Sequence, residues 1–201
     1  MAVEQTPFAH GMVTGTIGRA DYVAGLAQLG CLHRELEAAT ETAAASLPAD
    51  LIPPPRTPAI DRDLLALGGT AVAEPHEAVA ELTARFHRWA AATPTALLGA
   101  IYVMEGSRMG SMVLARSLTR ALHVEPRPGQ GLDYHIDGIA TRPTDWKAFR
   151  ERLATTELSP DDRDAVVAVA VEVMDALTAL YASVPVTPIE ASAPSREAVA
   201  V

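Results

Sequence analysis

Two glycines in one apolar stretch have the type and spacing to serve chemistry. Between Pro94 and about Leu122, hydrophobic residues recur every three or four positions and predict a helix. That stretch also holds Gly99, Gly106 and Gly110, and each glycine inside a helix costs about 1 kcal/mol relative to alanine. Gly106 and Gly110 are four residues apart, so they expose one turn of bare backbone on one face. A flat ligand could lie there, or a second helix could pack closely, or the helix could kink.

Other residues that carry chemistry are sparse. Ser107 and Ser111 lie beside the two glycines. His33 and Glu37 are spaced four apart and could chelate a metal, although such a pair is more often an ordinary helix contact. None of the six histidines has a partner spacing typical of a metal site, so none is predicted. Cys31 is the only cysteine, which excludes an internal disulfide and favours a small packed side chain.

Several classes of protein are disfavoured by motifs and charge. The segment GSRMG does not place its serine at the centre of a G-x-S-x-G elbow, and there is neither a P-loop nor a G-x-G-x-x-G motif after a strand. A formal net charge of -9 opposes nucleic-acid binding. No uninterrupted apolar run reaches the roughly 20 residues of a membrane span, and no signal peptide is recognisable. We therefore expect a cytoplasmic protein with no nucleic-acid or membrane partner.

The elements that must position these residues are all predicted to be helices, in one all-α domain. A stripe of Tyr22, Leu26, Leu29, Leu32 and Leu36 predicts a long helix that fades near Ser46. Further helices are predicted over 63–67 with Asp61 as the cap, from Pro75 to about residue 92, over 94–122, after Asp145, and from a Ser159 cap to about Val184.

The connections and the tail complete the predicted organisation. Pro48, the run 53–55 and Pro58 predict a stiff, non-helical surface connection. Residues 124–142 are rich in Pro, Gly and Asp without a period and predict a long surface excursion. The helical domain is expected over residues 1–184. Residues 185–201, rich in Pro, Ser, Ala and Glu, are expected to be a disordered tail.

The glycine stretch also carries a family resemblance. Residues 98–110, LGAIYVMEGSRMG, resemble the distal-helix signature of bacterial heme oxygenases, LG-x-x-YVLEGS-x-LGG. Weaker similarities follow in the same order and extend the resemblance from about Val3 to Ser183. They are residues 15–22, 33–37, 61–68 and 146–150.

The resemblance implies a heme oxygenase-like helical bundle that cleaves heme to biliverdin, carbon monoxide and ferrous iron with dioxygen. Heme would be both cofactor and substrate, and electrons would come from a separate reductase or ferredoxin. By the resemblance, the backbone at Gly106 and Gly110 would approach heme and leave room for dioxygen, and Ser107 would hold part of a water network. Arg150 would pair with a heme propionate. Tyr102 could bond a propionate, but packing of its ring is the expected role.

The resemblance also places the family's proximal histidine just upstream of Met1. The alternatives are a start placed too far downstream, a substitute ligand, or a protein without iron–histidine coordination, and we favour truncation. His10 lies ten residues along, about 15 Å on a helix, and cannot substitute without moving the heme. A non-catalytic heme or tetrapyrrole-binding protein, or a non-heme iron enzyme using His33 and Glu37, therefore remain alternative functions.

Overall fold

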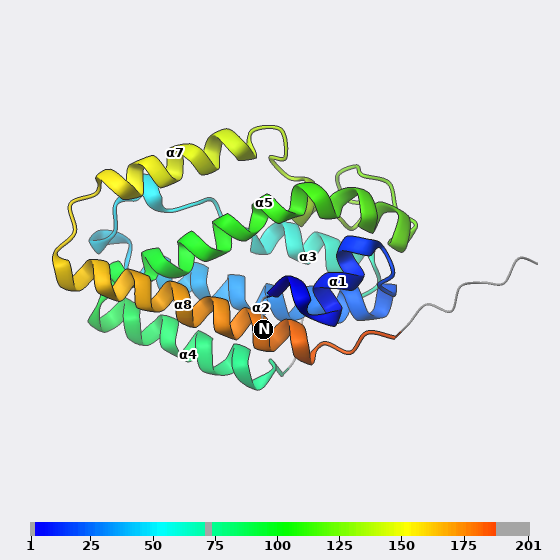
Figure 1. Ribbon diagram of the computed structural model, residues 1–201, viewed down its shortest axis with the longest axis horizontal. Coiled ribbons are helices and arrows are strands. Elements are labelled where there is room, and N and C mark those ends of the chain that lie inside the picture. Colours follow the sequence, from blue (N-terminus) through cyan, green and yellow to red (C-terminus); the bar gives the residue numbers. More distant parts are fainter. Residues whose placement is uncertain (1–2, 71–73, 188–201) are drawn as a thin grey trace, which may run out of the picture.

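The computed structural model describes residues 3–70 and 74–187, and these form helices without a strand (Figure 1). The all-α class predicted from the sequence is confirmed. The α-helices are α1 (Pro7–Thr14), α2 (Arg19–Thr42), α3 (Thr57–Ala66), α4 (Glu77–Ala92), α5 (Leu97–Leu122), α6 (Asp133–Ile136), α7 (Arg142–Thr155) and α8 (Pro160–Ser183). The short 3-10 helices are η1 (Val3–Gln5), η2 (Ala44–Ser46), η3 (Ala49–Leu51) and η4 (Pro94–Ala96).

The long helices begin and pack much as their patterns predict. The whole apolar stripe predicted for α2 is buried. At the start of α8, the Ser159 hydroxyl accepts the amide N–H of Asp162 at 3.1 Å, and Pro160 occupies the first turn. This side chain satisfies one of the amides that a helix start leaves free. The predicted cap of α8 is therefore confirmed.

The predicted start of α3 is wrong. The helix begins at Thr57 rather than near Asp63, and Pro58 lies in its first turn, where proline costs no hydrogen bond. Asp61 is inside the helix, and the cap comes from another helix. The Glu37 carboxylate of α2 accepts the amide N–H groups of Arg56 and Thr57 at 2.6 and 3.1 Å. A cap supplied from a distant part of the chain leaves no local sequence signal.

The segment predicted as a surface excursion is partly buried. Leu132, Tyr134 and His135 are at most 6% exposed and belong to α6 or its N-cap. The cause is the fully buried Asp63 carboxylate, which accepts the amide N–H groups of Asp133 and Tyr134 at 2.6 and 2.8 Å. These bonds fix α6 against α3. Asp63 therefore determines where α6 packs, whereas the sequence predicted it only as the first residue of a short helix.

The start of α7 also differs from the prediction. The helix begins at Arg142 with Pro143 in its first turn, so Asp145 lies inside the first turn rather than at the cap. Its carboxylate accepts the Thr141 hydroxyl at 2.7 Å. An acidic residue in the first turn of a helix interacts favourably with the helix dipole. Acidic residues are therefore common both at the cap and in the first turn, and the sequence alone did not distinguish the two positions for Asp145.

The helices α5 and α8 make a close backbone contact at Gly99. A Cβ atom at Gly99 would lie 2.2 Å from the carbonyl oxygen of Val166 and 2.9 Å from the amide nitrogen of Ala170. Neither atom is a flexible side-chain end, so the position requires glycine. Close helix packing, one of the explanations considered for these glycines, applies to Gly99.

One face of α8 is apolar but uncovered. Among the described helices, α8 alone has the length and apolar composition that a membrane crossing would need, and 22% of its apolar window is buried. Val169, Val173 and Leu177 face the core. Val167 and Met174, in contrast, are 64% and 42% exposed.

The chain remains attached to the bundle after α8. The amide N–H of Thr187 donates to the Asp21 carboxylate at 2.7 Å, and Val184 is buried. The predicted disordered tail, 185–201, falls mainly on residues 188–201, which lie outside the described residues.

Substitution of Gly99 by alanine tests the α5–α8 contact. The new methyl group would meet backbone atoms, so the helices must separate and the core must repack. We expect Gly99→Ala to lower the free energy of unfolding by about 3 kcal/mol in urea denaturation. Gly68→Ser, at a position with no atom within 4 Å but with a positive φ, is the control for a purely conformational cost of about 1 kcal/mol. Equal losses in the two variants would contradict the close contact.

Candidate functional site

The short helix α1 covers only one end of the groove between α5 and α8. The Ser117 hydroxyl of α5 donates to the carbonyl oxygen of Met12 at 2.7 Å. On the other side, the Phe8 ring packs edge-on against Tyr181 of α8, with 5.0 Å between the centroids. Helix α1 therefore contacts the C-terminal part of both long helices.

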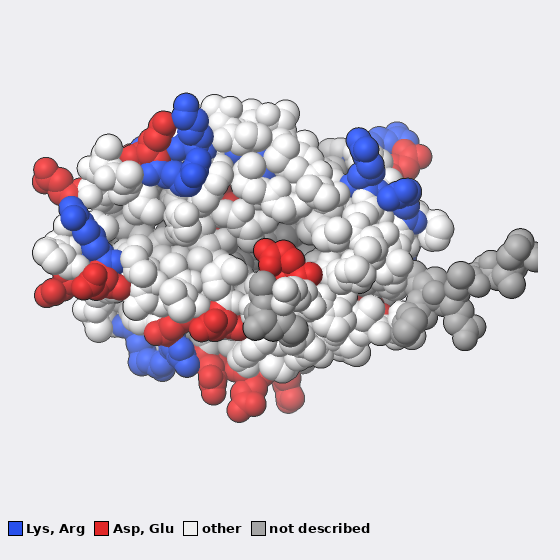
Figure 2. All heavy atoms as spheres, in the orientation of Figure 1, with Lys and Arg blue, Asp and Glu red and all other residues white. Residues whose placement is uncertain are grey.

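The faces of α5 and α8 that α1 contacts extend past the end of α1, and no helix in the described part of the chain packs over them there. Residues seven apart in a helix share a face, so Gly110 continues the face of Ser117 on α5. Met174 continues the face of Tyr181 on α8 in the same way. A Cβ atom at Gly110 would meet no atom within 4 Å. Figure 2 shows the surface hollowed between the ridges formed by α7 and α8, and Figure 1 places α5 between them.

Helix α7 forms the opposite wall of this hollow. A Cβ atom at Gly106 would lie 3.1 Å from the Trp146 ring. The Tyr102 ring is 5.1 Å from that indole, centroid to centroid, and the Arg150 guanidinium lies 5.5 Å from its centroid. The structure thus leaves Gly110 open, covers Gly106 with an aromatic ring, and brings Tyr102 and Arg150 to the same wall. We refer to the hollow between α7 and α8, with α5 at its floor, as the slot.

The polar side chains next to the glycines differ in exposure. Ser107 is exposed, and its hydroxyl donates to the carbonyl oxygen of Met104 on its own helix at 2.8 Å. Ser111 is 3% exposed and is hydrogen-bonded to His135 Nδ1 at 2.9 Å. Tyr102 is 39% exposed, and it packs against Trp146 as well as facing solvent.

A network of buried ions behind α5 was not predicted from the sequence. The Glu105 carboxylate accepts Arg108 Nη1 at 2.8 Å and two nitrogens of Arg56 at 3.3 Å. Arg142, 2% exposed, donates to the carbonyl oxygens of Arg108, His135 and Asp137. Burial, followed by the nearby arginines, lowers the pKa of Arg142 to about 10. These bonds tie α6 and α7 to α5 and so hold the slot walls together.

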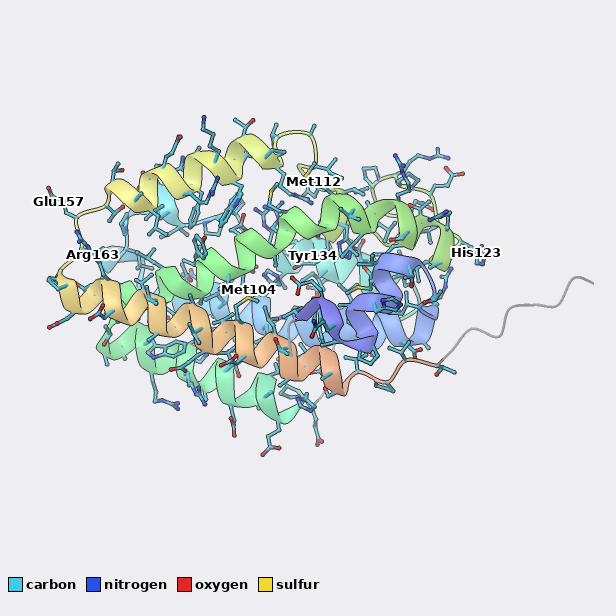
Figure 3. The ribbon with its side chains drawn as sticks, viewed as in Figure 1. Met104, Met112, His123, Tyr134, Glu157 and Arg163 are labelled. Carbon is cyan, nitrogen blue, oxygen red and sulfur yellow. The ribbon has the colours of Figure 1, made fainter. Side chains whose placement is uncertain are left out.

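Two histidines are buried beside this network. His33 Nε2 is hydrogen-bonded to the hydroxyl of Tyr134, labelled in Figure 3, at 3.0 Å. Burial, reinforced by Arg56 and Arg108, lowers the pKa of His33 to about 3. Burial and then Arg142 lower the pKa of His135 to about 3 as well. Both imidazoles are therefore neutral near pH 7.

The possible metal pair of His33 and Glu37 has other roles. Their side chains are 4.0 Å apart, and Glu37 caps α3. Over residues 3–70 and 74–187, no three His, Cys, Asp or Glu side chains are grouped as a metal site would require. The arrangement gives no support to a non-heme iron centre built on these two residues.

This geometry, a helical bundle with an open glycine turn facing an apolar slot, defines the heme oxygenase-like class. The chain belongs to the heme oxygenase family, whose model matches residues 1–181. Both the family and the function class indicated by the glycine motif are confirmed.

Solved structures support the same fold. The heme oxygenase of Leptospira interrogans has a TM-score of 0.79 at 19% identity, covering 90% of this chain and 91% of that one. Heme oxygenase-2 of Synechocystis sp. PCC 6803, in complex with heme and NO, has a TM-score of 0.75 at 21% identity, with coverages of 89% and 77%. Heme oxygenase-1 of that cyanobacterium, in complex with heme, has a TM-score of 0.74 at 16% identity, with coverages of 89% and 83%. No curated protein matches.

The buried histidines predict how stability depends on pH. A histidine with a folded pKa of about 3 takes up a proton mainly in the unfolded chain, whose pKa is near 6.5, so stability falls as pH drops through 6.5. From pH 7 to pH 5 each histidine should remove about 2 kcal/mol. Asp63, whose pKa burial raises to about 6, acts in the opposite direction and offsets part of this loss.

Urea denaturation of His135→Gln at pH 7 and pH 5 isolates one contribution. The variant should lose about 2 kcal/mol less than the unchanged chain on acidification. Exposed His123→Gln is the control and should follow the unchanged chain. An undiminished loss in His135→Gln would show that His135 is not a buried neutral group.

Proposed function

We propose that this chain is a heme oxygenase that binds heme in the slot, with the macrocycle against the open backbone of Gly110. The observation that carries the proposal is that α1 covers the faces of α5 and α8 only at Ser117 and Tyr181. The same faces are uncovered at Gly110 and Met174. Val167, Val171 and Met174 are exposed there, although apolar side chains of this size gain about 1.5–3 kcal/mol each on full burial. A flat apolar ligand would bury them.

The residues present fit the chemistry of heme. The porphyrin is flat and apolar with two carboxylates at one edge, and the slot offers bare backbone, apolar walls and one guanidinium. Arg150 would hold a propionate, because a planar guanidinium suits a carboxylate. Tyr102 stands beside Trp146 and could donate to the same edge. The buried His33 and His135 bond Tyr134 and Ser111, so we do not assign either as the axial ligand.

Gly106 requires one adjustment on binding. Its bare backbone is packed against the Trp146 ring, so a macrocycle reaching both glycines would have to displace the indole. We infer that Trp146 closes over the glycine turn in the free protein and moves aside for heme. Its displacement would turn the cation Arg150, stacked on the same ring, toward the slot.

The chain's own contribution would be orientation and proton supply. When bound, heme provides both the iron at which dioxygen is activated and the carbon skeleton that is cleaved. The backbone at Gly106 and Gly110 would leave room for dioxygen, which a side chain there would fill. Ser107, exposed beside them, would hold water near that space.

We also propose a separate electron donor and a cytoplasmic location. The sequence carries no recognisable nucleotide-binding motif of its own. Figure 2 shows Lys and Arg side chains over α7, beside the slot, with acidic side chains next to them, and Lys147 and Arg152 pair with Glu151 and Asp50. The exposed cationic groups of this helix would attract an acidic donor such as a ferredoxin.

Turnover with purified components tests the function. The chain, given hemin, a ferredoxin and its reductase, should release biliverdin, whereas NADPH alone should not support the reaction. Gly110→Ala should stabilise the free protein by about 1 kcal/mol, because the space is open and alanine favours helix. The same methyl group should lower biliverdin formation at least tenfold. A variant that is both more stable and fully active would contradict a heme-facing role for Gly110.

The role of Arg150 is tested by heme affinity. Arg150→Gln should raise the Kd for hemin about tenfold, since a charge-assisted hydrogen bond to a propionate is lost. Arg152→Gln is the matched control, because Arg152 lies on the same helix but donates to the carbonyl oxygen of Asp50. Hemin titration followed by absorbance measures both. Equal affinities in the two variants would exclude Arg150 as the propionate partner.

A further inference from the structure

A cavity of about 530 Å³ lies between α2 and the segment 52–56, apart from the slot. Helix α5 contributes Ile101, Met104 and Glu105 to its lining. Among the described residues, none of α7 or α8 lines it. Cavities of about 300–1,000 Å³ are typical of small-molecule sites. The cavity therefore has the size of a binding site and is separate from the walls of the slot.

Most of the residues that line the cavity are apolar. Leu36, Ile101 and Met104 form its deep part and are at most 5% exposed. The prolines 53–55 line it from the connecting segment. Mostly apolar walls with a few polar groups are the usual lining of a small-molecule site.

The proline segment is held at both ends. Arg152 Nε donates to the carbonyl oxygen of Asp50 at 3.0 Å, before the prolines. After them, the amide N–H of Arg56 donates to the Glu37 carboxylate of α2 at 2.6 Å. Proline also restricts the backbone between these two points. The segment therefore cannot easily fold onto α2, and the cavity is preformed.

His33 presents an unpartnered nitrogen to this cavity. The residue is 3% exposed and belongs to the lining. Its Nε2 bonds the Tyr134 hydroxyl, whereas its Nδ1 has no hydrogen bond among the described residues, and the Glu37 carboxylate is 4.0 Å away. Nδ1 is not one of the fully enclosed polar atoms without a partner, so it touches open space. A ligand that bonds Nδ1 would satisfy a group whose burial without a partner is costly.

Glu37 offers an acceptor beside that nitrogen. Its two bonds, to the amide N–H groups of Arg56 and Thr57, both use Oε1, so Oε2 keeps its capacity to accept. A hydroxyl group both donates and accepts. It could therefore bond His33 in either tautomer, and it could donate to Glu37 while accepting from Nδ1–H.

The charges around the cavity disfavour a charged ligand. An anion bonded to Nδ1 would lie beside the Glu37 carboxylate, and like charges at such a distance repel. A cation would lie near two arginines. Burial, reinforced by Arg56 and Arg108, already lowers the pKa of His33 to about 3, which shows a positive field at the imidazole. A neutral polar group avoids both penalties.

We propose that this cavity binds a small neutral molecule with an apolar body and one hydroxyl group, such as a phenol. The hydroxyl would lie between His33 Nδ1 and Glu37, and the apolar body would pack against Leu36, Ile101 and Met104. The proposal concerns binding only, with no bond formed or broken. It does not rest on the proposed heme function, because the cavity lies apart from the slot.

Calorimetric titration of the heme-free chain at pH 7 tests the ligand class with three matched probes. The neutral 2-naphthol should bind at least tenfold more tightly than 2-naphthoate or 2-naphthylmethylamine, which place opposite charges on the same ring system. A charged probe that binds as tightly as 2-naphthol would overturn the proposal. So would the absence of naphthol binding.

The location is tested with Ala38→Phe. Ala38 lines the cavity but is exposed on α2, so a ring there would occupy the space without disturbing the core. The Kd for 2-naphthol should rise at least tenfold. Ala24→Phe is the matched control, at an exposed alanine of the same helix outside the lining, and should leave the Kd within twofold. An unchanged Kd in Ala38→Phe would place the naphthol elsewhere and overturn the proposal.

Nitrogen NMR of the histidine rings provides a measurement on the unchanged chain. Saturation with 2-naphthol should shift the Nδ1 resonance of His33, whereas the resonances of exposed His123 should stay in place. Bound naphthol with an unmoved His33 resonance would overturn the assignment. None of these measurements uses hemin, so a chain that formed no biliverdin would contradict the proposed function and leave this test unaffected.

Discussion

The absence of a Cβ atom at three positions on one face of α5 is the constraint on which the rest of the structure depends. Gly99, Gly106 and Gly110 share that face, yet each meets a different neighbour. At Gly99 the backbone of α8 fills the space, at Gly106 an indole ring does, and at Gly110 nothing does. One helix thereby serves as a packing surface at its start and as the floor of an open slot further along.

The slot exists because α1 is short while α5 and α8 are long. The eight residues of α1 cover Ser117 of α5 and Tyr181 of α8. Beyond α1, the same faces of these two long helices have no helix packed over them among the described residues. Hydrogen bonds of Glu105, Arg108 and Arg142 hold α6 and α7 against α5. They therefore keep α7, which forms one wall of the slot, apart from α8. Buried charges are costly unless they are compensated. Arg108 pairs with Glu105, whereas Arg142 is held by three carbonyl oxygens and has no carboxylate partner within residues 3–70 and 74–187.

Elements governed by local patterns could be predicted from the sequence, whereas those governed by distant contacts could not. The stripe of α2 and the Ser159 cap of α8 need only their own neighbours. The starts of α3 and α6 depend on Glu37 and Asp63, which come from other parts of the chain. The glycine motif was found because bare backbone in a helix is costly. The Ser111–His135 pair joins residues 24 apart, and no periodicity predicts such a contact.

The most direct test of the central claim is the crystal structure of the heme complex. The porphyrin plane should lie against the backbone of Gly110, between α7 and α8, with the Trp146 ring displaced from Gly106. A porphyrin bound elsewhere, such as in the cavity of about 530 Å³ between α2 and the 52–56 segment, would contradict it. So would a complex in which Trp146 still covers Gly106 while heme occupies another surface.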